Sequence, residues 1–200
     1  MPRAVAIVVA LLLIAVAVQL PRQAASQSGP GWITLLDGKS KTMGDWDRLG
    51  DANWRIEDGA VVADKRDKVN AYLVGKTSYT NLEIHAEFWA SDDANSGVFF
   101  RCANPKAIGA KVCYEANIFD QSKGDGTGAL TNFARPNPPV RAGGRWNTFE
   151  ISARGPQIVI KLNGQTTAEA KDTTYTAGVV SLQYLAGTIK WRKVAVRPLP

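Results

Sequence analysis

Two side chains of opposite charge, Arg101 and Glu115, lie on either side of a short loop and could do chemistry together. A carboxylate can act as a general base, and a nearby cation can stabilise the negative charge that develops when a proton is removed. Strict alternation along extended segments places Arg101 on one face with Asn95, and Glu115 on one face with Asn117. If Cys102 and Cys113 stand directly opposite each other in a regular ladder, Arg101 opposes Tyr114 and faces away from Glu115, so a β-bulge or an irregular loop must intervene for the two to meet. The alternative is that Arg101 and Glu115 form a cross-strand ion pair on the surface, which contributes little to stability.

Other acidic residues suggest two further kinds of site, and neither fits well. Glu115 and Asp120 could form the carboxylate pair of a hydrolase, but alternation places them on opposite faces. Residues 120–126 supply oxygen ligands for Ca²⁺ without the spacing of a helix-loop-helix site, so we interpret them as a polar loop. The single histidine, His85, has no ligand partners at metal-binding spacing and is expected at a solvated strand position. We therefore assign no metal ligand and no firm cofactor, with a divalent cation left open.

The two cysteines, Cys102 and Cys113, flank the loop between the two charged candidates. In an exported chain they are expected to form a disulfide. Closing so short a loop would stabilise the fold by roughly 2–3 kcal/mol. A catalytic thiol is the weaker interpretation, because no second histidine is present to activate it.

The first residues have the pattern of an export signal. A basic start, Met1 to Arg3, precedes an apolar run from Ala4 to Val18 and then small residues near Ala25. The run is shorter than the about 20 apolar residues of a membrane-spanning helix, so cleavage is favoured over a permanent anchor. We expect a signal peptide over residues 1–26, one domain over residues 30–200, and a periplasmic or extracellular protein with no stable membrane span. The net charge of +6 is scattered along the chain and does not indicate nucleic-acid binding.

The elements that must position these residues are predicted to be strands. Apolar and polar residues alternate in Leu82 to Phe88, and the Asp58-Gly59 and Asn163-Gly164 pairs are typical of two-residue hairpin turns. Further strands are predicted over residues 96–101, 112–119, 148–153, 178–184 and 189–196. Residues 120–139 are rich in glycine and proline and predict a long surface loop. The pattern predicts an all-β fold, a two-sheet antiparallel β-sandwich of the jelly-roll type.

Several strings, taken in order, resemble one family. They are Leu35-Leu36-Asp37-Gly38-Lys39, Trp54 to Gly59, Asn81 to Phe88, Asn95 to Arg101, Tyr114-Glu115, Gly144 to Thr148, Leu162-Asn163-Gly164 and Trp191 to Leu199. In these strings the chain resembles the bacterial 3-keto-disaccharide hydrolases, also described as 3-keto-glucoside lyases and hydratases, whose domains are concanavalin-like jelly rolls. The resemblance covers nearly all of the chain after the predicted signal.

The resemblance implies an exported enzyme that cleaves 3-keto-glycosides by hydrolysis, or by elimination and hydration, with Glu115 as base and Arg101 as charge stabiliser. It also implies a sugar or glycan ligand, and we expect a monomer that does not bind nucleic acid. The polar residues expected to contact sugar hydroxyls are Lys76, Asn95, Asn117, Asp120, Gln183 and Tyr184.

Three positions depart from the family pattern. No histidine follows Leu182-Gln183, Leu130 rather than tyrosine follows Gly128-Ala129, and Asn117 replaces a glutamine. The alternative is therefore a glycan-binding or structural β-sandwich without catalytic activity.

Overall fold

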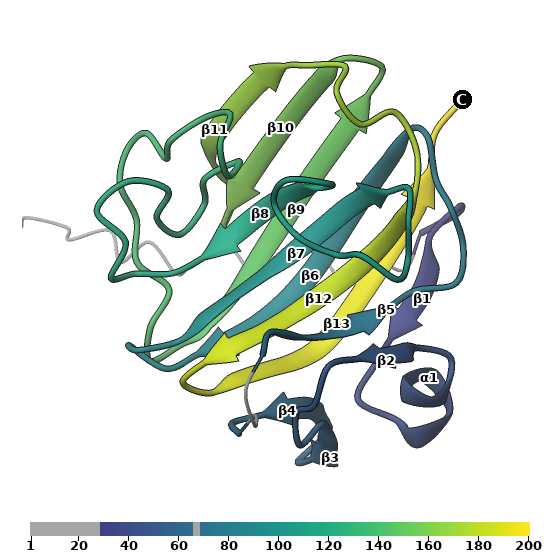
Figure 1. The fold of residues 1–200 in the computed structure, drawn as a ribbon, viewed down its shortest axis with the longest axis vertical. Helices are drawn as coiled ribbons and strands as arrows, with labels where there is room; N and C mark the ends of the chain where they lie inside the picture. The colour runs from purple at the N-terminus through teal and green to yellow at the C-terminus, as the bar shows by residue number, and fades with distance from the viewer. Residues whose placement is uncertain (1–28, 66–68) are drawn as a thin grey trace, which may run out of the picture.

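The structure, a computed structural model, describes residues 29–65 and 69–200, so the predicted signal peptide lies outside the described residues. Two antiparallel sheets face each other, as the sequence pattern predicts (Figure 1). The small sheet has the order β2 (Asp47–Leu49), β5 (Ala71–Val74), β12 (Val179–Ala186), β7 (Asn95–Cys102) and β8 (Tyr114–Ile118). The large sheet has the order β11 (Gln165–Lys171), β10 (Gln157–Leu162), β9 (Trp146–Arg154), β6 (Leu82–Ala90), β13 (Ile189–Pro198), β4 (Ala60–Ala63) and β3 (Arg55–Glu57), with β1 (Ile33–Leu36) also on β13. One short helix, α1 (Ser40–Gly44), follows β1.

Both predicted hairpins form. Glu57 pairs with Ala60 across Asp58-Gly59, and Leu162 pairs with Gln165 across Asn163-Gly164. All four turn residues have positive φ angles, between 51° and 81°. This left-handed backbone costs little for glycine and is tolerated by asparagine and aspartate, which is why these pairs set the hairpin registers.

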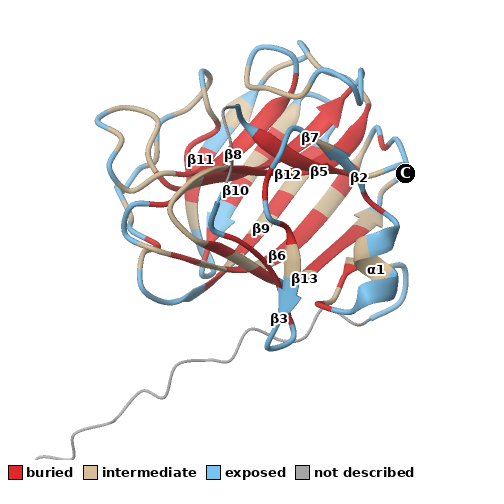
Figure 2. Cartoon of the chain, turned by 60° about the horizontal axis from the view of Figure 1, so that its bottom comes forward, coloured by how far each residue is buried: buried red, intermediate tan, exposed pale blue. Residues whose placement is uncertain are grey.

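The main hydrophobic core lies between the sheets, and Figure 2 shows buried segments along both layers. Its central side chains include Phe88, Phe149 and Trp191 from the large sheet, whose rings pack on one another. From the small sheet, Val98, Phe100 and Leu182 point into the same core. Residues that alternate with these three, such as Phe99 and Gln183, must therefore lie on the outer face of the small sheet.

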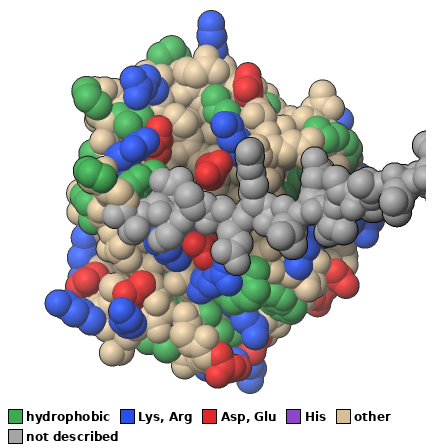
Figure 3. Space-filling model, turned by 180° about the vertical axis from the view of Figure 1, so that it is seen from behind, with side chains coloured by type: hydrophobic (Ala, Val, Ile, Leu, Met, Phe, Trp, Pro, Cys, Tyr) green, Lys and Arg blue, Asp and Glu red, His purple; other side chains and the backbone are tan. Residues whose placement is uncertain are grey.

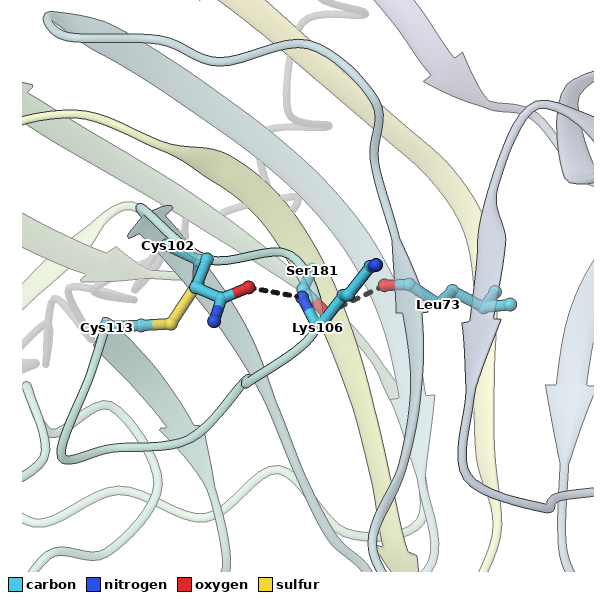
Figure 4. Close-up of a disulfide and its surroundings, with 6 residues drawn as sticks. Leu73, Cys102, Lys106, Cys113 and Ser181 are labelled. Carbon is cyan, nitrogen blue, oxygen red and sulfur yellow. Dashed lines mark hydrogen bonds between the residues drawn. A yellow bond between two sulfur atoms is a disulfide. The ribbon is translucent and has the colours of Figure 1, made fainter.

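A second, smaller apolar cluster covers part of that outer face. Tyr72, Val74, Phe99 and Val179 form it, with Ile108 and Ala110 of the loop over residues 103–112 packed against them. The predicted disulfide between Cys102 and Cys113 closes this loop, which we call the disulfide loop (Figure 4). Beneath it, the Ser181 hydroxyl donates to the Leu73 carbonyl at 2.8 Å. The disulfide thus holds a loop against the face that carries Glu115.

The outer face of the large sheet is charged, with both signs interspersed in the view from behind (Figure 3). Cross-strand pairs contribute to this pattern, among them Arg197 with Glu83 and Arg192 with Glu87. His85 lies between them and is 1% exposed, so the expectation of a solvated position is wrong. The edge of Trp32 packs against the His85 ring, and its Nε2 lies 3.1 Å from Oε1 of Glu87.

No helix among the described residues is long and apolar enough to cross a membrane.

Candidate functional site

Glu115 lies on the outer face of the small sheet, where it pairs with Phe99 of β7. Two residues further along β8 on the same face is Asn117, in a row with Gly97 of β7 and Gln183 of β12. A Cβ atom at Gly97 would lie 2.7 Å from Oε1 of Glu115, closer than real contacts allow. The carboxyl group therefore lies over Gly97, in the row that holds Gln183 and Asn117. We call these four residues the Glu115 site.

Glu115 is only 6% exposed, and this burial changes the chemistry of its carboxyl group. Burial raises the pKa of Glu115 from its ordinary value of 4.5 to about 7. The nearby Thr131 hydroxyl opposes this shift, whereas the negative charge of Asp125 adds to it. A carboxyl with a pKa near neutrality can take up or release a proton at physiological pH, which is what a general acid or base requires.

The two amide side chains of the site differ in how they are bound. The Asn117 amide donates to the carbonyl of Asp125, so this donor is already engaged. Gln183 is 5% exposed, and its Oε1 atom has no hydrogen-bond partner among the described residues. Because a buried acceptor without a partner costs free energy, Gln183 is a position where a hydroxyl group of a ligand would be stabilised.

Two loops cover the Glu115 site and are tied together by Asn132. The Asn132 side chain donates to the Ala110 carbonyl of the disulfide loop at 2.9 Å. Its backbone N–H donates to the Asp125 carboxylate at 3.1 Å, within the long loop after β8. The same loop adds to the sheet edge, where the Thr131 N–H donates to the Glu115 carbonyl. A ligand that reaches the Glu115 carboxyl must therefore pass between or displace these loops.

The structure does not bring Arg101 to the Glu115 carboxyl. A bulge is present, since two residues of β7, Phe100 and Arg101, stand against the single residue Val180 of β12. Arg101 has a φ of 53° there, and its guanidinium binds the carbonyls of Thr80, Gly155 and Tyr175 at 2.7, 2.9 and 3.4 Å.

Arg101 thus crosslinks backbone segments on the core side of the sheet. Burial lowers the pKa of Arg101, and its electrostatic interaction with the neighbouring Tyr114 opposes this shift. The bulge turns the side chain away from Glu115, so the geometry offers Arg101 a structural role in place of the expected charge stabilisation.

Three of the four other expected sugar contacts lie apart from the carboxyl or are engaged within the protein. Lys76 stands beyond β5 at the opposite edge of the sheet, 3.7 Å from the Asp47 carboxylate. Tyr184 points into the core, and its hydroxyl donates to the Gly187 carbonyl. Asp120 accepts hydrogen bonds within the long loop. Asn95 begins β7, half-buried and on the same side as Gly97 by alternation.

No group of three or more histidine, cysteine, aspartate or glutamate side chains in the described part of the chain could hold a metal ion. A histidine-bound metal, which the family resemblance would allow, does not fit this site, because His85 lies on the outer face of the other sheet.

The sequence analysis missed the residues that shape the site around Glu115, namely Gly97, Asp125, Thr131 and Asn132. One of them had a usable signal. A glycine inside a strand pattern, as at Ser96-Gly97-Val98, marks a place where another group approaches the backbone closely. The loop residues had no such signal, because their positions depend on long-range contacts.

Comparison with known proteins agrees with the fold. Residues 31–197 match the model of one family, the 3-keto-alpha-glucoside-1,2-lyase-like domain. Two similar solved structures from Parabacteroides distasonis ATCC 8503 bear the name "putative glycosyl hydrolase". The first has a TM-score of 0.72 and 18% identity, covering 85% of this chain and 94% of that one. The second has a TM-score of 0.66 and 22% identity, covering 84% of this chain and 99% of that one.

A carbohydrate-binding module of Bacillus subtilis, CBM66, has a similar fold, with a TM-score of 0.59 and 16% identity over 84% of this chain and 95% of that one. No curated protein sequence matches the chain. At these identities the comparison shows only a shared fold, which occurs both in proteins named as glycosyl hydrolases and in a carbohydrate-binding module.

Proposed function

Given that this chain belongs to the family of 3-keto-alpha-glucoside-1,2-lyase-like domains, we propose that it is an exported enzyme that cleaves 3-keto-glycosides, with Glu115 as its general base. The observation that carries the proposal is the Glu115 carboxyl, which is buried over Gly97 and whose pKa is raised to about 7. The disulfide is consistent with an oxidising compartment outside the cytoplasm.

The chemistry needs one proton transfer to start it. A ketone at C3 of a sugar acidifies the hydrogen on C2, because the electron pair left behind is delocalised onto the ketone oxygen as an enolate. The ionised Glu115 carboxylate takes this proton. The enolate then re-forms the ketone, a C1–C2 double bond forms, and the C1–O bond breaks as the aglycone leaves with its oxygen and gains a proton. Addition of water across the double bond gives the free 3-keto sugar.

Gln183 is the residue best placed to orient the sugar ring beside Glu115. Its free Oε1 would accept a hydrogen bond from a ring hydroxyl, and its amide N–H groups are donors of the kind that stabilise a developing enolate oxygen. Burial strengthens both interactions, since the local dielectric is low. Asn117 contributes less directly, because its amide holds Asp125 in place.

A second candidate function is glycan binding without catalysis. It is favoured by the two loops that cover Glu115, by the absence of a histidine after Gln183, and by a fold shared with a carbohydrate-binding module. In that case a protonated, uncharged Glu115 would donate a hydrogen bond to a sugar hydroxyl.

The test is turnover of a 3-keto-glucoside by the wild type and by Glu115→Gln, with and without added divalent metal. Release of the aglycone should be lost in the variant, and kcat/KM of the wild type should rise as the pH passes about 7, where the base ionises. Glu169→Gln is the matched control, because Glu169 is an exposed residue on β11. Saturable sugar binding without release by either protein would reject the enzyme and leave the binding module.

A further inference from the structure

A basic pocket lies in the long loop after β8, beyond the Glu115 site. Its volume is about 380 Å³, and Lys123, Arg135 and Arg141 project around it with Asp120. The backbone of Gly124 forms part of the wall, where an added methyl group would lie 3.8 Å from Nη2 of Arg135. The absence of side chains at Gly124 and Gly126 therefore leaves room beside the guanidinium.

The three cations of this pocket have no acidic partner. Among the described residues, no carboxylate oxygen lies within 4.0 Å of the side-chain nitrogens of Lys123, Arg135 or Arg141. This contrasts with the large sheet, where Arg192 and Arg197 pair with glutamates and both signs are interspersed (Figure 3). An unpaired cluster of like charge is a place where an anion would be bound.

Asp120 forms no ion pair with these cations, because its oxygens accept hydrogen bonds within the loop. They accept hydrogen bonds from the Thr127 hydroxyl at 2.5 Å, the Ala142 N–H at 3.0 Å and the Gly143 N–H at 2.8 Å. These bonds hold both ends of the loop together around the pocket. Three positive side chains against one carboxylate leave the pocket with an excess of positive charge.

The loop that carries the cations is fixed in shape. Pro136 and Pro139 line the pocket and restrict the backbone between Arg135 and Arg141. The Asn137 N–H donates to the Thr167 carbonyl of β11 at 2.7 Å, which anchors the same stretch to the large sheet. A fixed backbone reduces the entropy that is lost when an anion binds.

We propose that this pocket binds the anionic group, a carboxylate or a sulfate, of an acidic glycan. Arginine side chains suit both groups, since the guanidinium presents two parallel N–H donors. The pocket begins at Asp120, two residues after the end of β8, the strand that carries Glu115. In this proposal the anionic group belongs to a sugar unit other than the one over Glu115. The glycan part of this proposal rests on the proposed function, whereas anion binding itself does not.

The experiment is calorimetric titration of the wild type with three probes: a tetragalacturonate, a neutral glucose tetrasaccharide and inorganic sulfate. At about 50 mM salt, where surface charges are weakly screened, the acidic tetrasaccharide should bind at least tenfold more tightly than the neutral one. Arg135→Gln and Arg141→Gln should each weaken the acidic probe by about tenfold, because a charge-assisted hydrogen bond is lost. Arg154→Gln, an exposed arginine at the far end of β9, should leave binding unchanged.

Each contrary result has a definite meaning. Equal affinity for the acidic and neutral tetrasaccharides, or an equal loss with Arg154→Gln, would overturn the pocket as a specific site. Binding of sulfate alone would overturn the assignment to a glycan. If Glu115→Gln and the wild type are both inactive while acidic binding still depends on Arg135 and Arg141, the proposed reaction fails and the anion pocket stands.

Discussion

Replacing Glu115 by glutamine is expected to stabilise the protein at alkaline pH and to change it little at acid pH. The pKa of Glu115 is raised from 4.5 to about 7 in the fold, chiefly because burial disfavours the charged form. The native state therefore binds this proton more tightly than the unfolded chain does. Below pH 4.5 the group is protonated in both states, and no free energy is lost.

The size of the effect follows from the same shift. As the pH rises from 4.5 through about 7, the wild type loses about 3 kcal/mol of unfolding free energy, at about 1.4 kcal/mol for each tenfold change in proton affinity. Glutamine is nearly the same size and does not ionise, so Glu115→Gln avoids this loss. The difference between variant and wild type should grow from near zero at about pH 4.5 to about 3 kcal/mol at about pH 8.5.

Urea unfolding across this pH range, followed by tryptophan fluorescence, measures the difference directly. Titrating groups that do not interact with Glu115 contribute equally to both proteins and cancel. The exposed Glu169→Gln variant should follow the wild type at every pH. If the wild-type and Glu115→Gln profiles ran parallel, the carboxyl would not be desolvated in the fold, and the argument for Glu115 as a base near neutrality would fail.

Three further substitutions test the surrounding structure. Gly97→Ala places a Cβ 2.7 Å from the Glu115 carboxyl oxygen, so it should cost about 1–3 kcal/mol and reduce any Glu115-dependent turnover at least tenfold. Cys102→Ser with Cys113→Ser should lower the unfolding free energy by about 3 kcal/mol, as measured in urea, because it frees the unfolded chain. Arg101→Met should cost about 2–4 kcal/mol, because three backbone carbonyls lose the donor that the buried Arg101 side chain supplies, and should leave the Glu115-dependent pH profile of stability unchanged.

Each of these has a control in the same chain. Gly44→Ala adds a methyl group where nothing lies within 4 Å, and it should be tolerated. Reduction of the wild type should reproduce the double serine variant. Arg154→Gln removes an exposed arginine and should have little effect on stability. An Arg101→Met protein as stable as Arg154→Gln would contradict the crosslinking role given to Arg101.

The sequence predicted the fold well because its strongest signals are local. The Asp58-Gly59 and Asn163-Gly164 turns form as expected, and the period of two in Leu82 to Phe88 matches the paired strand β6. Short strands such as β2 and β5 were missed, since β2 has only three residues and the four residues of β5 are all buried and show no alternation.

The site could be predicted only in part. Glu115 was identified as a candidate, but its environment depends on segments that are distant in the sequence, such as Asn132 against Ala110. The prediction that Arg101 meets Glu115 required a bulge because it placed Arg101 opposite Tyr114. In the structure Phe100 pairs with Tyr114 and Phe99 with Glu115, so alternation alone would put Arg101 on the face of Glu115. The bulge that is present lies against β12. Its effect is to turn Arg101 toward backbone carbonyls on the other side of the sheet, a direction that alternation cannot supply.

The position of β13 has a consequence for how the chain folds. This strand, Ile189–Pro198, pairs with β1, β4 and β6 and so lies in the interior of the large sheet. Most of its partners are more than a hundred residues away, and contacts of such long range slow folding, since distant segments must meet before they are stabilised. Until residues 189–198 emerge from the ribosome, the edges of β1 and β4 that pair with β13 have no partner strand. The nascent chain therefore stays incompletely folded until synthesis of the domain is nearly finished, which keeps it in a state that an export machinery or a chaperone could bind.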